Sequence, residues 1–139
     1  MPNEGFCFDR IPDQMNGFFG SNNICDFTLF KAPNFYYIES KASYNDNMPF
    51  NMLTDYQYDH MREKAHIAGV KSYAIFLFAS YRRAFIFDIL DIEKSIAEGV
   101  KSVNIKKVDR WKIPYTEIPT VQSRKQLLDY DKDFAKKFF

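Results

Sequence analysis

Two acidic side chains and a lysine occupy two short runs whose residue types favour neighbouring β-strands. Asp26 precedes the apolar run Phe27–Phe30, and Glu39 and Lys41 end the run 35–41. Side chains alternate between the faces of a strand, so Glu39 and Lys41 point the same way and Ser40 points to the other face. The intervening segment, Lys31–Asn34, contains Pro and Asn and predicts a hairpin loop. Antiparallel pairing would therefore bring Asp26 back alongside the end of the second strand.

The chemistry that suits this set is metal-dependent cleavage of a phosphodiester. Two converging carboxylates repel each other unless a hard cation such as Mg²⁺ lies between them, bound also by a backbone carbonyl and waters. Such a cation lowers the pKa of a bound water and stabilises charge on a scissile phosphate. Lys41 could orient that water or neutralise the phosphate. The alternative is the solvated face of an amphipathic strand. The apolar runs beside both acids favour the functional interpretation, because unpaired charges near a core are costly.

The elements that would position these residues follow from periodicity, caps and turns. A helix from Thr54 or Asp55 to about Ala68, ended by Gly69, would bury a stripe of Tyr58, Met61, Ala65 and Ala68. The basic turn Arg82–Arg83 separates two strands of a hairpin that would finish the sheet. The expected strands cover residues 6–11, 24–31, 35–41, 72–79, 84–89 and 103–108, and two further helices cover 91–99 and 123–137.

The ordered set of motifs resembles a known family. Asp26, Glu39–Lys41, Ser43, Pro49–Phe50 and Gln57, in this order, are similar to the PD-(D/E)XK nuclease superfamily, and within it to RecU-type Holliday-junction resolvases and their phage-borne relatives. The resemblance runs from about Phe8 onward. It implies an α/β restriction-endonuclease-like core with a mixed central β-sheet flanked by helices. It also implies Mg²⁺-dependent (or Mn²⁺-dependent) hydrolysis of branched DNA, in a phage or phage-derived setting.

The resemblance also implies a role for each site residue. Asp26 and Glu39 would be metal ligands together with the backbone carbonyl of Ser40, and Lys41 would be the catalytic lysine. Gln57 would position Lys41, a water or a phosphate; its alternative is an ordinary glutamine on a helix surface. Symmetric cutting of a junction needs two sites, so a homodimer is expected.

One departure from the family pattern concerns the beginning of the sequence. The family usually starts with a helix carrying a Gly-Lys-x-x-Glu type motif, whereas here Phe6–Ile11 reads at once as a strand, and Glu4 is too close to it to substitute. This predicts a shortened form, cover from a partner subunit, or a weakened site. Two further functions therefore stay open: a nuclease-fold protein that binds DNA or a protein without cutting, and a restriction-type endonuclease.

Composition agrees with one domain over residues 1–139. The 139 residues are 46% hydrophobic and include 15 Phe and 9 Tyr, enough for a single core. No stretch approaches the roughly 18 apolar residues of a membrane span, and no export signal is evident, which predicts a cytoplasmic protein of a bacterial host or phage-infected cell. Cys7 and Cys25 are expected to be reduced, and the spacing of His60 and His66 does not suit zinc.

Charge is distributed unevenly along the sequence. Residues 1–60 contain 3 Lys or Arg and 8 Asp or Glu, whereas residues 61–139 contain 16 and 10. An acidic, metal-binding half and a basic half fit an enzyme that cleaves phosphates, although solvated charge runs are common. Basic residues surround the only tryptophan, Trp111, which either stacks on an unpaired base or belongs to the core. The candidate DNA contacts are Ser43, Arg82, Arg83, Lys106, Lys107, Arg110, Lys112, Arg124 and Lys125.

Overall fold

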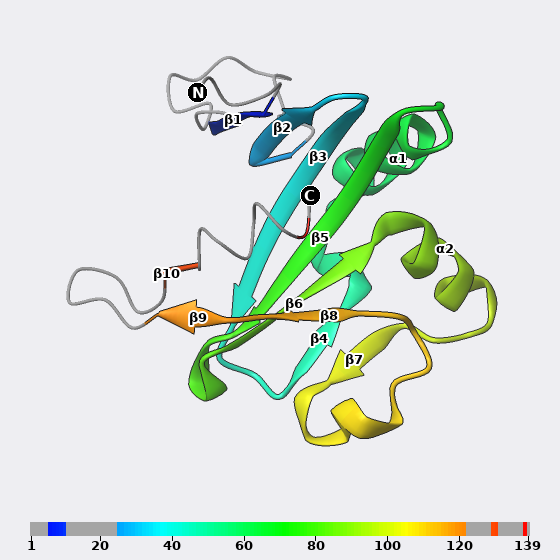
Figure 1. Cartoon of the computed structure of the whole chain (residues 1–139). Helices are drawn as coiled ribbons and strands as arrows, with labels where there is room; N and C mark the ends of the chain where they lie inside the picture. Colours follow the sequence, from blue (N-terminus) through cyan, green and yellow to red (C-terminus); the bar gives the residue numbers. More distant parts are fainter. Residues whose placement is uncertain (1–5, 11–24, 122–128, 131–137, 139) are drawn as a thin grey trace, which may run out of the picture.

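A six-stranded mixed sheet forms the centre of the fold (Figure 1). The computed structural model describes residues 6–10, 25–121, 129–130 and 138. Strands β3 and β5 run parallel, and every other neighbouring pair is antiparallel. The α/β class with a mixed central sheet is thereby confirmed. In spatial order the strands are β1 (Phe6–Arg10), β2 (Phe27–Lys31), β3 (Asn34–Ser43), β5 (Val70–Phe78), β6 (Arg83–Asp88) and β8 (Thr116–Ile118).

The β2–β3 hairpin forms as the sequence predicts. Phe27 pairs with Ile38 and Lys31 pairs with Asn34, so the two residues of the turn are Ala32 and Pro33. Asp26 directly precedes Phe27, and its backbone N–H donates to the carbonyl of Ile38 at 3.1 Å. This register places Asp26 opposite Glu39, the residue that follows Ile38.

The crossover from β3 to β5 contains β4 (Asn47–Pro49), a 3₁₀ turn (Phe50–Met52) and α1 (Asp55–Ala65). Thr54 caps α1: its side chain accepts from the Gln57 N–H at 3.1 Å, and the Gln57 side chain accepts from the Thr54 N–H at 3.2 Å. The expected C-terminus was wrong by three residues, and Ala68 is exposed rather than part of a buried stripe. The turn after Ala65 needs Gly69 at φ +84°, a conformation that glycine adopts readily.

Strands β5 and β6 supply the largest buried side chains. Phe76, Phe78, Phe85 and Phe87 are all fully buried, as expected for central strands covered on both faces. Helix α2 (Ile89–Ala97) follows β6 without a loop, because the Asp88 carboxylate accepts from the Leu90 N–H at 2.9 Å and caps it. The helix therefore starts two residues before the expected Asp91.

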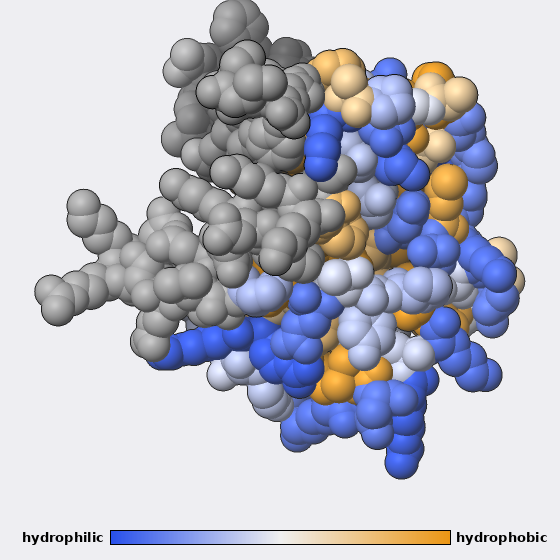
Figure 2. All heavy atoms as spheres, viewed as in Figure 1, coloured by the Kyte–Doolittle hydropathy of each residue, from blue (hydrophilic) through white to orange (hydrophobic). Residues whose placement is uncertain are grey.

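Two apolar clusters lie on the two faces of the sheet. One joins Phe76 and Phe87 to Met61 of α1 and Ile92 of α2, so both described helices cover the same face. The other cluster, around Ile38, contains side chains of β2, β3, β5, β6 and β8. Glu39 and Lys41 alternate with Ile38 and share the helix-covered face. On the side viewed in Figure 2, the described surface mixes hydrophilic residues with small separate apolar patches.

The segment after α2 differs from the expectation. Only β7 (Ser102–Asn104) is extended, and it pairs with β4 outside the main sheet. Residues Ile105–Arg110 form a 3₁₀ segment instead of a strand, because the Asn104 side chain accepts from the Lys106 N–H at 2.9 Å and starts a turn. The expectation that the β5–β6 hairpin ends the sheet is also wrong, since β8 pairs with β6.

The expected closing helix over residues 123–137 is only partly testable. Its described part, β10 (Asp129–Tyr130), pairs with β9 (Thr120–Val121), so a continuous helix across this range is wrong. Arg124 and Lys125 lie outside the described residues. Among the helices that the structure describes, none is long and apolar enough to cross a membrane.

Candidate active site

The two acids meet where β2 begins beside the middle of β3. The Ser40 N–H donates to Asp26 Oδ2 at 3.1 Å, which fixes the Asp26 carboxylate against the edge of β3. Glu39 lies on the helix-covered face and is only 2% exposed, although it is a carboxylic acid. The hairpin register thus brings together the two carboxylates that the sequence predicted to converge.

Glu39 is only partly compensated in this position. Lys41 Nζ lies 3.2 Å from Glu39 Oε2, as the spacing of two residues on a strand predicts. The other oxygen, Oε1, is buried and has no hydrogen-bond partner within the described part of the chain. Burial, and after it the negative charge of Asp26, raise the pKa of Glu39 from 4.5 to about 7, against the lowering effect of Lys41. The structure therefore holds a buried acid with one oxygen paired to Lys41 and the other unpartnered among the described residues.

The residues present fit a hard divalent cation. An unpartnered carboxylate oxygen next to a second carboxylate is the kind of oxygen donor set that Mg²⁺ and Mn²⁺ prefer. The described residues contain no group of three or more His, Cys, Asp or Glu side chains that could hold a metal. Asp26 and Glu39 would accordingly supply two ligands, and backbone oxygen and water would supply the others.

The neighbours of the acids are apolar or neutral. Cys25 is fully buried, its thiol donates to the Phe27 carbonyl at 3.1 Å, and burial raises the pKa of that thiol to about 11. It is therefore a buried, neutral thiol. Tyr37 packs its ring edge-on against Phe35, at 5.0 Å between centroids. The Lys41 side chain, by contrast, is 21% exposed and accessible to a ligand from solvent.

Two further predicted site residues have local structural roles. The Gln57 side chain closes the capping box of α1 rather than contacting the acids. Ser43 Oγ accepts from the Asn45 N–H at 3.0 Å in the loop that follows β3. Neither contact reaches the Asp26–Glu39 pair, so their direct roles remain predictions.

Two of the predicted basic residues form ion pairs with acids that the structure describes. Arg83 forms a bidentate ion pair with Glu117, at 2.9 and 2.7 Å, across β6 and β8. Lys106 lies 3.2 Å from Asp46. Arg82 is exposed in the turn between β5 and β6, as predicted. These contacts involve acids distant in sequence, so spacing alone did not indicate them.

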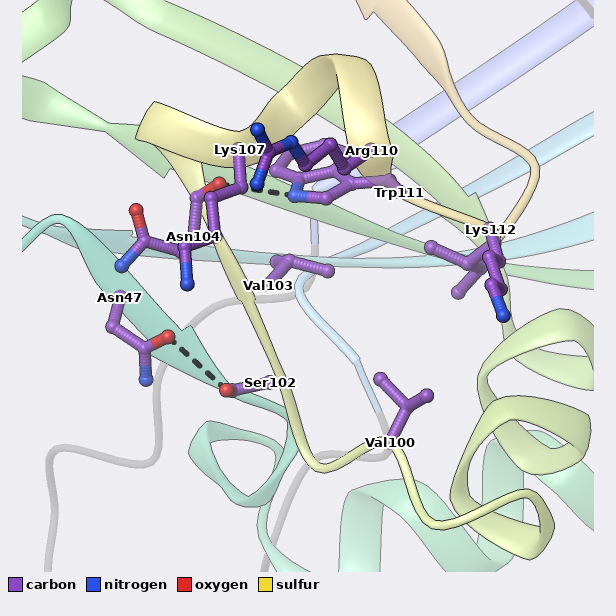
Figure 3. Close-up of a pocket in the computed structure, with 10 residues that line it drawn as sticks. Asn47, Val100, Ser102, Val103, Asn104, Lys107, Arg110, Trp111 and Lys112 are labelled. Atoms are coloured by element: carbon purple, nitrogen blue, oxygen red, sulfur yellow. Dashed lines mark hydrogen bonds between the residues drawn. The ribbon is translucent and has the colours of Figure 1, made fainter.

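The remaining three cations surround one cavity, shown in Figure 3. Lys107, Arg110 and Lys112 line it with Trp111, whose ring packs on Phe85 at 5.0 Å between centroids. Trp111 is thus partly buried and packs against the core, and its indole N–H donates to the Asn104 carbonyl at 3.0 Å. Three polar residues of this cavity were not predicted from the sequence: Asn47, Ser102 and Asn104. The signal that could have indicated them is Asn104, whose side chain caps the turn that forms the cavity.

Comparison with known proteins adds the family. A solved structure of Hjc, a Holliday junction resolvase from the archaeon Archaeoglobus fulgidus, is similar at 14% identity and a TM-score of 0.47, over 74% of this chain and 78% of that one. No curated protein matches the sequence. The model of the RecU family, recombination protein U, matches residues 9–132. This match covers most of the chain and confirms the RecU-type resemblance, so this chain belongs to the RecU family of recombination proteins.

Proposed function

We propose that this chain hydrolyses phosphodiester bonds of branched DNA, with Holliday junctions as the main substrate and Mg²⁺ or Mn²⁺ as the cofactor. One observation carries the proposal most directly: the buried Oε1 of Glu39, unpartnered among the described residues, lies in a site shared with Asp26 and Lys41. Family membership supports the choice of branched DNA.

Each side chain then has a defined task. Asp26 and Glu39 hold the cation with the Ser40 backbone carbonyl, and the Ser40 N–H keeps Asp26 in place. When bound, the cation supplies a water of lowered pKa and stabilises charge on the phosphate. Lys41, partly exposed beside Glu39, orients that water or neutralises the phosphate. Gln57 acts as a positioning residue through the cap that fixes the start of α1.

The proposed DNA-contacting surface consists of the cations that remain accessible. Arg82, Lys107, Arg110 and Lys112 are exposed and lie among the described residues. A junction has two equivalent strands to cut, so the active form is a homodimer with one site in each subunit. Light scattering of the protein on an uncut junction would give the mass of two chains; a mass of one chain on a junction that is cut symmetrically would contradict this.

The test is cleavage of an end-labelled four-way junction with Mg²⁺. Wild type should cut, and Glu39→Ala and Lys41→Ala should each be slower by on the order of 10²-fold or more. Glu98→Ala and Lys71→Ala remove the same charges at exposed positions, directly after α2 and in β5, and should cut normally. Equal activity of wild type, Glu39→Ala and Lys41→Ala would refute the proposal.

The same assay separates the two other functions. A linear duplex of the same sequence should be cut far more slowly than the junction, whereas a restriction-type enzyme would cut it at least as well. Junction binding without cleavage under Mg²⁺ or Mn²⁺, with Asp26, Glu39 and Lys41 intact, would instead identify a binding protein of nuclease fold.

A further inference from the structure

A cavity of about 430 Å³ lies between β4, β7 and the segment Lys107–Ile113. Its size is within the range of small-molecule sites. Val103, Trp111 and Ile113 give it apolar walls, and Asn47 and Ser102 give it a polar side where the Ser102 hydroxyl donates to Asn47 Oδ1 at 3.1 Å (Figure 3). Both an apolar group and a hydrogen-bonding group can therefore be accommodated.

The charge of the cavity has one sign. Lys107, Arg110 and Lys112 line it, and no carboxylate of the described residues does. None of the three forms an ion pair with any residue that the structure describes, in contrast to Lys106 and Arg83 outside the cavity. Figure 3 shows Lys112 on the far side of the cavity from Asn47. Three uncompensated cations around an apolar floor favour a ligand with a negative group and a flat apolar group.

The cavity lies close enough to the acids for one ligand to serve both. It belongs to the layer that covers the same sheet face as Glu39, because Met48 of β4 and Val103 of β7 join the helix-side cluster. Five residues lie between Lys41 and Asn47, so six Cα-to-Cα steps bound the distance between their Cα atoms at about 20 Å. A DNA strand advances about 3.4 Å per nucleotide, so the bound corresponds to roughly six nucleotides.

From these observations we propose that the cavity binds one nucleotide, its phosphate at the three cations and its base or sugar against Trp111 and Val103. The inference rests on the proposed function in that the nucleotide is part of the DNA substrate, a few positions from the bond that is cut. A free mononucleotide shares this chemistry, and the experiment distinguishes the two sources.

Trp111 is the only tryptophan of the chain and lines the cavity, so its fluorescence reports occupancy directly. The full chain is titrated without divalent metal with a 12-nucleotide single strand and, separately, with thymidine 5′-monophosphate. We expect a saturable change in Trp111 emission with the oligonucleotide. The triple variant Lys107→Ala/Arg110→Ala/Lys112→Ala should bind about tenfold more weakly or worse, with a salt dependence reduced by about 0.7 per lost contact.

A second variant tests the cavity without changing charge. Val100 lines the cavity and is 36% exposed, and it is replaced by phenylalanine to fill the space. Val100→Phe should weaken binding as the triple variant does. The matched controls, Lys64→Ala/Lys71→Ala/Lys94→Ala for charge and Ile67→Phe for an exposed apolar residue, should bind within about twofold of wild type.

The outcomes separate this inference from the cleavage proposal. Equal weakening in the triple variant and its charge control, with Val100→Phe unaffected, would overturn the nucleotide site even if the junction is cut. An unchanged Trp111 emission with both probes would also overturn it. A response without cleavage would support the site while the proposed activity fails. Saturation by the mononucleotide at similar concentration would identify a free nucleotide, and a response to the oligonucleotide alone would identify DNA.

Discussion

Lys41 Nζ lies 3.2 Å from Glu39 Oε2, while Oε1 of the same carboxylate is buried without a hydrogen-bond partner among the described residues. Lys41 therefore pairs with only one of the two oxygens of a carboxylate that is also repelled by the negative charge of Asp26. Leaving a buried polar atom unpaired costs about 1–3 kcal/mol, and more for a charged group. A site that retains this cost on a central strand is arranged for a positive ligand.

Stability should depend on pH through Glu39. The pKa of Glu39 is raised from 4.5 in the unfolded chain to about 7 in the fold. The contribution of Glu39 to the free energy of unfolding is therefore fully present below about pH 4.5 and is lost as the pH rises to 7. In metal-free buffer, Glu39→Gln should exceed wild type in unfolding free energy by on the order of 3 kcal/mol at pH 8 and by almost nothing near pH 4.5.

Chemical denaturation with EDTA at the two pH values measures this difference. Glu98→Gln, at the exposed position directly after α2, is the matched control and should show no such pH dependence. A gap between Glu39→Gln and wild type that is the same at both pH values would mean that Glu39 is not a buried acid with a raised pKa.

Asp26→Asn should weaken metal binding while keeping the local fold. The amide oxygen can still accept from the Ser40 N–H, but the charge that repels Glu39 is lost. We expect the pKa of Glu39 to fall and the affinity for Mn²⁺ to drop by at least about tenfold, because one anionic ligand is gone. Calorimetric titration with Mn²⁺ measures the affinity. Asp109→Asn, exposed on the 3₁₀ segment, should bind as wild type does; an equal loss in both variants would argue for nonspecific charge.

Gln57→Ala should destabilise the fold by about 0.5–1 kcal/mol, because the capping box of α1 loses one of its two hydrogen bonds. Gln57→Glu preserves an acceptor at this position and should retain the stability. Gln57→Glu, which keeps the cap, should cleave a junction at the wild-type rate at a temperature where it is folded. Slow cleavage by a fully folded Gln57→Glu would show that Gln57 acts on the reacting groups directly.

The Arg83–Glu117 pair should contribute little despite its bidentate geometry. Both side chains are more than a third exposed, so solvent screens the attraction. A double-mutant cycle with Arg83→Ala and Glu117→Ala should give a coupling of about 0.5 kcal/mol in unfolding free energy. A coupling near zero would indicate that the pair does not hold β8 to β6.

The strands of the candidate active site could be predicted because side-chain alternation and turn formation depend only on residues close in sequence. Alternation along β3 fixed the common face of Glu39 and Lys41, and the Ala32–Pro33 turn fixed the hairpin that returns Asp26. The buried character of β5 followed from its continuous apolar run.

The failures depend on contacts that are distant in sequence or on single caps. Asn104 turns the chain into a 3₁₀ segment where residue types favoured a strand, and this turn places Lys107 beside the cavity. Arg83 and Lys106 are paired with acids 34 and 60 residues away, at Glu117 and Asp46. The hydrophobic periodicity of a sequence contains no information on ion pairs between residues so far apart.

The most direct test of the metal site is the position of Mn²⁺ in a crystal soaked with the ion, located by its anomalous scattering. We expect one peak within roughly 2 Å of oxygens of both Asp26 and Glu39, with Oε1 of Glu39 among them. A protein that cleaves junctions with Mn²⁺, yet binds the ion elsewhere or shows no peak between these two carboxylates, would contradict it.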